Sequence, residues 1–156
     1  MNCYEVLGVL PGVTSVVGSG GKTTLLSKLS QEVRGTVVLT TSTHILPFPN
    51  MPLLENPTLS EVKDALTTHR VICVGAFSGE KHKLGPSALC AQELASVADY
   101  VFVEADGSKR LSLKAHAPHE PVIPEGSRHT IQVVGLSGFG LNIKERIIIE
   151  AEPITL

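Results

Sequence analysis

The sequence Val16-Val-Gly-Ser-Gly-Gly-Lys-Thr-Thr24 joins an apolar run to three leucines at helical spacing, Leu25, Leu26 and Leu29. It therefore predicts a strand, a tight glycine turn and the start of a helix. Glycines let backbone N–H groups approach an anion closely, and the N–H groups of a helix's first turn are free to bind it. The stretch predicts a nucleotide-phosphate loop made by Gly18, Ser19, Gly20, Gly21, Lys22, Thr23 and Thr24.

The spacing of this loop differs from the usual Walker A pattern. That pattern has its first glycine six residues before the lysine, where this chain has Val16, and the first glycine here is Gly18. The resulting Gly-x-x-Gly-Lys-Thr loop is similar in spacing to the ATP loop of the Mur ligases. We expect Lys22 to bind phosphate and the Thr23 hydroxyl to bind Mg²⁺. The alternative is a glycine-rich turn with a solvated lysine.

Composition favours one globular domain. The chain has 156 residues, of which 42% are hydrophobic and 18% charged, with a net charge of −2. Without a basic block or a long apolar run, we expect neither a nucleic-acid partner nor a membrane span. The three cysteines, Cys3, Cys73 and Cys90, are too scattered for a disulfide framework or a zinc site, so we expect a cytoplasmic protein.

Alternating apolar runs and amphipathic segments predict an α/β fold of the P-loop NTPase kind. We expect a mainly parallel sheet of about five strands with helices on both faces. The strands are expected near residues 14–17, 36–41, 70–76, 100–104 and 130–135, and the helices near 22–33, 58–69 and 86–97. Four prolines predict that residues 47–57 form an irregular surface loop.

The end of the chain reads differently from the rest. We expect an α/β nucleotide-binding domain over residues 1–141 and an atypical tail over 142–156. The run Ile147-Ile148-Ile149 resembles a strand that closes no predicted layer. Either it pairs with another segment, a second copy of the chain included, or the domain lacks a covering piece through truncation.

Polar clusters follow the carboxyl ends of the predicted strands, the edge at which open parallel sheets bind ligands. Val101-Phe-Val-Glu-Ala-Asp106 resembles a Walker B strand, an apolar run that ends in acid. Glu104 and Asp106 project to the same side of an extended chain. We expect them to hold Mg²⁺ and, with Lys22, to form the catalytic centre of phosphate transfer. The alternative is an ordinary strand that ends in a solvated turn.

Other candidate groups are weaker. Thr43 and His44 are expected to line the phosphate site. Lys109, with Arg110 and Lys114, forms a basic cluster that can clamp phosphates or an anionic substrate, or simply lie in solvent. His116 and His119 have the spacing of a helical metal-ligand pair, but Pro118 between them argues against a helix. A hydrogen-bonding or general-base role and simple surface exposure remain open for these histidines.

Four segments together resemble a known family. They are Val17 to Thr24, Thr41-Ser-Thr-His-Ile45, Val103-Glu-Ala-Asp-Gly-Ser-Lys-Arg110 and Leu113-Lys-Ala-His-Ala-Pro-His-Glu-Pro-Val-Ile-Pro124. The chain resembles the selenium-dependent molybdenum hydroxylase accessory proteins over about residues 14–140. The resemblance implies a nucleotide-binding protein, with ATP or GTP and Mg²⁺, that serves maturation of such a hydroxylase. It implies phosphate and metal roles for Lys22 and Thr23 and a metal role for Glu104 and Asp106.

Three functions compete at this point. The first is a Mg²⁺-dependent NTPase or phosphoryl or nucleotidyl transferase, favoured by the two carboxylates. The second is a non-catalytic, nucleotide-gated chaperone that binds a hydroxylase apo-enzyme or its cofactor, favoured by the lack of an obvious general base. The third, a ligase of the Mur type, needs more substrate domains than this chain provides.

Overall fold

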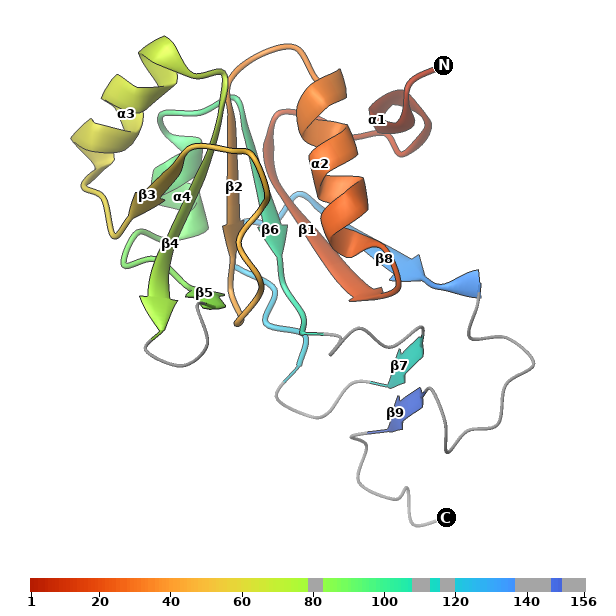
Figure 1. The fold of residues 1–156 in the computed structure, drawn as a ribbon. Helices are drawn as coiled ribbons and strands as arrows, with labels where there is room; N and C mark the ends of the chain where they lie inside the picture. The colour runs from red at the N-terminus through yellow and green to blue at the C-terminus, as the bar shows by residue number, and fades with distance from the viewer. Residues whose placement is uncertain (79–82, 108–112, 116–119, 137–146, 150–156) are drawn as a thin grey trace.

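The structure is a computed structural model that describes residues 1–78, 83–107, 113–115, 120–136 and 147–149. Its centre is a seven-stranded sheet in the order β3-β4-β2-β6-β1-β8, with β5 paired to β4 (Figure 1). All neighbours along that order pair in parallel, and β5 pairs antiparallel. The strands are β1 (Gly12–Ser19), β2 (Val37–Thr41), β3 (Leu53–Glu55), β4 (Val71–Ser78), β5 (Lys83–Gly85), β6 (Tyr100–Glu104) and β8 (His129–Val134).

Helices cover both faces of this sheet (Figure 1). They are α1 (Cys3–Val6), α2 (Lys22–Glu32), α3 (Leu59–Thr68) and α4 (Ala91–Ala95). Leu26 and Leu29 of α2 pack with Leu39 and Phe102 in one apolar cluster. Side chains of α3 and α4 pack with Val38 and Val103 in the other. The alternation of side chains along each strand thus separates an α2 face from an α3–α4 face.

The central strands are buried along their whole length, because helices cover them on both sides. All five residues of β2 and of β6 are buried, as are seven of the eight residues of β1. After β1 the chain runs through α2 to β2, and β6 lies between β1 and β2 in the sheet. β8 lies on the opposite side of β1. The strand order therefore changes direction at β1, and in open α/β sheets ligands bind outside the carboxyl ends of the strands at such a point.

The structure confirms a mainly parallel α/β sheet and corrects several details. The sheet has seven strands, not about five. Residues 47–57 are not wholly irregular, because Leu53–Glu55 pairs with β4 as strand β3. The helix expected over 86–97 is shortened to α4, since the Cys90–Glu93 capping box starts it at Ala91 and Pro86 lies outside it.

The isoleucine run does form a strand. β9 (Ile147–Ile149) pairs in parallel with β7 (Leu113–Ala115) as a separate two-stranded sheet. Among the described residues, no helix is long and apolar enough to cross a lipid bilayer.

Candidate phosphate site and neighbouring pocket

Gly18 fixes the start of the loop. Its φ of +92° lies in the left-handed region, and a Cβ there would overlap the Val133 carbonyl oxygen of β8. Its N–H donates a hydrogen bond of 2.7 Å to Asp106 Oδ2, and both groups are buried. The end of β1 is thus held between a carboxylate that follows β6 and the backbone of β8.

Lys22 is the first residue of α2 and is buried, with 3% of its surface exposed. Gly21 precedes it with a φ of +116° and turns the chain from the strand into the helix. The Lys22 ammonium donates a 2.6 Å hydrogen bond to the Gly18 carbonyl oxygen and lies 3.7 Å from Glu104 Oε1. A cation is therefore held at the mouth of the loop, where the loop N–H groups and the helix terminus also favour negative charge.

Glu104 ends β6 and joins the same cluster. Its Oε2 accepts a hydrogen bond of 3.1 Å from the Thr23 hydroxyl, and the residue is 6% exposed. Burial raises the pKa of this carboxyl, while the Lys22 charge and the Thr23 hydrogen bond oppose the rise and Asp106 adds to it. The geometry joins four predicted residues, Lys22, Thr23, Glu104 and Asp106, around Gly18.

The donor set fits Mg²⁺ bound together with phosphate. The Thr23 hydroxyl and the Glu104 carboxylate offer adjacent oxygen ligands, the type that Mg²⁺ prefers. Within the described ranges, no group of three or more His, Cys, Asp or Glu side chains could hold a metal alone. A metal at this position would thus take its remaining ligands from phosphate oxygens and water, as Mg²⁺ commonly does.

The end of β2 is tied to the end of β6. The Thr41 hydroxyl donates a 2.9 Å hydrogen bond to the Glu104 carbonyl oxygen and accepts one of 3.0 Å from the Thr43 N–H. The Ser42 N–H also donates to the Glu104 carbonyl oxygen, at 3.2 Å. These bonds fix the backbone on which the Glu104 side chain stands.

The remaining predicted residues lie in several places. Ser19 is buried within β1, and Gly20 and Thr24 are exposed. Thr43 is half-buried beside Thr41, whereas the exposed His44 has its ring against Gly85 of β5. Lys109, Arg110, His116 and His119 lie outside the described residues, and of Lys114 only the backbone position in β7 is described.

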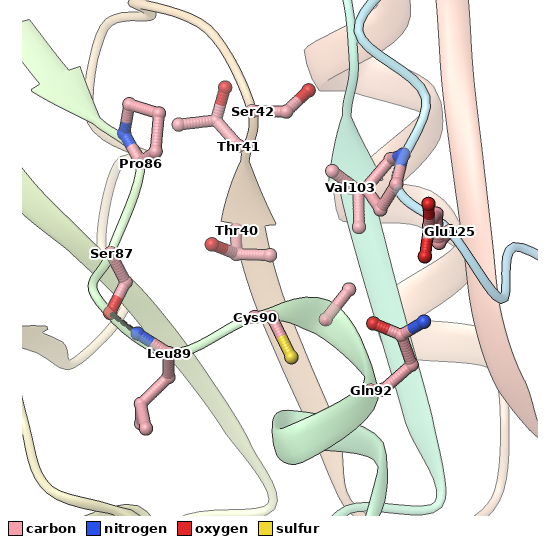
Figure 2. Close-up of a pocket in the computed structure, with 12 residues that line it drawn as sticks. Thr40, Thr41, Ser42, Pro86, Ser87, Leu89, Cys90, Gln92, Val103 and Glu125 are labelled. Carbon is pink, nitrogen blue, oxygen red and sulfur yellow. Dashed lines mark hydrogen bonds between the residues drawn. The ribbon is translucent and has the colours of Figure 1, made fainter.

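A pocket lies on the α3–α4 face of the sheet, at the carboxyl ends of β2 and β6 (Figure 2). Its volume is about 340 Å³, within the range of small-molecule sites. Thr40 and Val103, which are register partners, form its floor. Gln92 and Glu125 stand on one side and Pro86, Ser87 and Leu89 on the other (Figure 2).

Sequence reasoning did not assign Thr41, Gln92 or Glu125 to the pocket that they line. It also did not show that Thr41 holds the backbone of Glu104. Thr41 was visible within a run of four hydroxyl residues, but only the strand register shows that it holds β6. Gln92 and Glu125 are far apart in the sequence and carry no motif. The two residues come together only because residues 120–128 return along the sheet. This path is shown by the hydrogen bonds from Val122 N–H to the Ala105 carbonyl oxygen and from Arg128 N–H to the Val13 carbonyl oxygen.

The fold and the site together define a mainly parallel α/β protein whose glycine–lysine–threonine loop faces a buried acidic strand end. The YqeC protein family matches residues 14–152, and the chain belongs to this family. A relative is "Uncharacterized protein YqeC" of Escherichia coli (strain K12), which is 33% identical over 142 residues. That match covers 85% of this chain and 55% of the relative, so the chain spans about half of the relative's length. No solved structure matches the chain.

Proposed function

We propose that this protein is a nucleotide-binding accessory protein, using ATP or GTP with Mg²⁺, for maturation of a selenium-dependent molybdenum hydroxylase. The observation that supports nucleotide binding is the convergence of Lys22, Thr23, Glu104 and Asp106 on the Gly18 turn. Membership of the YqeC family and the resemblance of residues 103–124 to the accessory proteins support the maturation role.

The charge arrangement supports a phosphate ligand. Lys22 already forms a short contact with its own loop and a longer one with Glu104, so its ammonium is held at the loop's mouth. The negative charge of a triphosphate competes with the Glu104 carboxylate for the Lys22 ammonium. When Lys22 binds the phosphate instead, Mg²⁺ can compensate the charge of the Glu104 carboxylate. We therefore expect nucleotide binding to depend strongly on Mg²⁺.

Calorimetric titration of ATP, GTP and CTP, with and without Mg²⁺, tests this proposal. Lys22→Ala should weaken nucleotide binding at least about tenfold, the size of one charge-assisted hydrogen bond. Lys28→Ala is the matched control, because Lys28 lies on the same helix and its side chain is 59% exposed. If Lys22→Ala binds nucleotide as tightly as wild type, the phosphate-loop assignment is wrong.

Loss of Lys22 also leaves Glu104 buried without its cation, which destabilises the fold regardless of ligand. The double variant Lys22→Met with Glu104→Gln removes both charges and keeps the side-chain volumes similar. If it folds as stably as wild type and yet fails to bind nucleotide, the binding defect belongs to the loop rather than to unfolding.

A second candidate is binding without turnover, as in a nucleotide-gated chaperone for a hydroxylase apo-enzyme or its cofactor. The observation that favours it is that both carboxylates already contact protein: Asp106 holds the Gly18 N–H and Glu104 holds Thr23 and Lys22. Neither is thereby placed to activate an attacking water. Tight binding without phosphate release, and nucleotide-dependent capture of an apo-hydroxylase, would support this candidate, whereas steady phosphate release would exclude it.

A further inference from the structure

One side chain of β2 helps to hold the carboxylate that lies beside Lys22. Thr41 ends β2 and is the register partner of Glu104, which ends β6. Thr41 is buried, with 3% of its surface exposed, and its hydroxyl donates to the Glu104 carbonyl oxygen. The Ser42 N–H donates to the same oxygen, so the Glu104 carbonyl group is bonded twice to the end of β2.

The direction of the Thr41 hydroxyl is set by its other neighbour. The Thr43 N–H donates to Thr41 Oγ1 at 3.0 Å, which engages one lone pair of this oxygen. The single hydroxyl proton then has the Glu104 carbonyl oxygen as its nearest acceptor, at 2.9 Å. The carbonyl and hydroxyl oxygens of Thr43 are farther away, at 3.2 and 3.4 Å. The hydroxyl thus joins two backbone groups at the strand ends, which an apolar side chain cannot do.

The peptide group that follows Glu104 is also held from its other side. The Ala105 N–H donates a 3.0 Å hydrogen bond to the Val16 carbonyl oxygen of β1, so this peptide is fixed between β2 and β1. The Glu104 side chain extends from this fixed backbone to the Thr23 hydroxyl, the other candidate Mg²⁺ ligand. Because the position of a buried side chain follows its backbone, Thr41 acts on the Mg²⁺ donor set through Glu104.

We propose that Thr41 is a positioning residue for the Mg²⁺ that accompanies the nucleotide: its hydroxyl holds the backbone from which Glu104 offers its carboxylate to the metal. This inference rests on the nucleotide and Mg²⁺ site proposed above and adds a residue that acts through another. Removing a side chain that orients a metal ligand commonly lowers metal affinity by about 10- to 100-fold. The contribution of Thr41 therefore belongs to Mg²⁺-dependent binding and not to the contact of Lys22 with phosphate.

Calorimetric titration of ATP and GTP, with and without Mg²⁺, separates this role from a purely structural one. Thr41→Val removes the hydroxyl and keeps the shape of the side chain. It should lower the affinity for the Mg²⁺–nucleotide complex about tenfold and leave the weaker metal-free affinity unchanged. Thr41→Ser, which keeps the hydroxyl, should restore Mg²⁺-dependent binding.

Thr14→Val is the matched control for this substitution. Thr14 is likewise buried in the sheet, but its hydroxyl has no hydrogen-bond partner in the described part of the chain. Nucleotide affinity in Thr14→Val should equal that of wild type both with and without Mg²⁺.

A double-mutant cycle on the ligand-free protein tests the same role without nucleotide. Glu104→Gln changes the side chain but keeps the carbonyl oxygen that Thr41 binds, so the two changes interact only if Thr41 affects where the Glu104 side chain lies. The unfolding equilibrium constant of the Thr41→Val, Glu104→Gln variant should differ about threefold or more from the value expected if the single effects multiply. Thr14→Val combined with Glu104→Gln should give the multiplied value.

The two measurements distinguish the possible failures. If wild type binds no nucleotide with Mg²⁺, the proposed function fails, and the cycle alone decides whether Thr41 positions Glu104. Equal loss of affinity with and without Mg²⁺ in Thr41→Val, equal impairment in Thr41→Ser, or multiplicative effects in the cycle would each overturn the role given to Thr41.

Discussion

Gly18 shows how one residue determines the geometry of the candidate phosphate loop. Its backbone has a positive φ, its N–H binds Asp106, and the backbone of β8 occupies the space in which a side chain would stand. No other residue type meets all three conditions without strain.

We expect Gly18→Ala to lower the free energy of unfolding by at least about 2 kcal/mol, because a left-handed backbone costs an L-residue about 1–3 kcal/mol and the overlap with Val133 adds to it. Gly107→Ala is the control, since no atom of the described residues lies within 4 Å of a Cβ at that position and Gly107 is not among the positive-φ glycines given for the structure. Its effect should stay within about 0.5 kcal/mol. Urea denaturation of both variants measures the difference, and equal stabilities would contradict the role given to Gly18.

Glu104 should give the metal-free protein a measurable pH dependence. Its pKa is raised from the ordinary value of 4.5, mainly by burial, so the folded state holds the proton to higher pH than the unfolded state. The contribution of Glu104 to the free energy of unfolding is therefore greatest below the pKa of the unfolded state. It falls as pH rises towards the pKa of the folded state and is constant above it.

The measurement compares wild type with Glu104→Gln, in which this group cannot titrate. The stability of wild type relative to the variant should fall as pH rises from below 4.5, and thermal unfolding across that window follows it. A difference that rises with pH over the same window would mean that the Lys22 ion pair outweighs burial.

At the scale of elements, α3 begins with a capping box. Thr58 and Glu61 stand three residues apart in the sequence, which is the spacing of a capping box, and both reciprocal hydrogen bonds are present. Thr58→Ala should therefore destabilise the protein by about 1 kcal/mol. Thr67→Ala, in the last turn of the same helix, is the control and should cost less than half as much. Denaturant titration distinguishes the two variants, and an equal loss would show that the cap contributes nothing specific.

The elements that the sequence predicted well are those with long apolar runs. β2 and β6 are within one residue of their expected bounds, because fully buried strands leave continuous apolar stretches. β3 was missed because a three-residue strand among prolines carries no periodicity, and only its pairing with β4 makes it a strand. α4 was predicted too long because its amino end is set by the Cys90–Glu93 capping box rather than by Pro86.

The candidate site was predictable from the sequence only where its residues stand in local motifs. Gly18, Lys22, Thr23, Glu104 and Asp106 stand in local motifs, so their residue types and spacing were enough to select them. Their meeting depended on β1 lying next to β6, a pairing between segments about ninety residues apart that no local pattern contains. Gln92 and Glu125 could not be selected at all, because their proximity follows only from the path of residues 120–128 across the sheet.

At the scale of the whole molecule, nucleotide should stabilise the strand ends that meet at the loop. A ligand present at one hundred times its dissociation constant adds about 2.7 kcal/mol to the free energy of unfolding. Hydrogen exchange with Mg²⁺ and nucleotide should therefore slow at the carboxyl ends of β1, β2 and β6 more than in β3 or α3. Uniform slowing throughout the chain would indicate general stabilisation without a site at that edge.

The Thr41–Glu104 pair has a consequence for communication across the sheet. Thr40 and Val103 form the floor of the pocket, and the next register pair, Thr41 with Glu104, places the Glu104 carboxylate beside Lys22, so the pocket and the candidate phosphate loop share one pair of strand ends. If a ligand of the pocket and a nucleotide at the loop each shift these strand ends, each ligand changes the binding free energy of the other. Thermodynamic reciprocity then requires that the factor by which the nucleotide changes the affinity for a pocket ligand equals the factor by which that pocket ligand changes the affinity for the nucleotide. Two titrations performed in opposite order would return the same number.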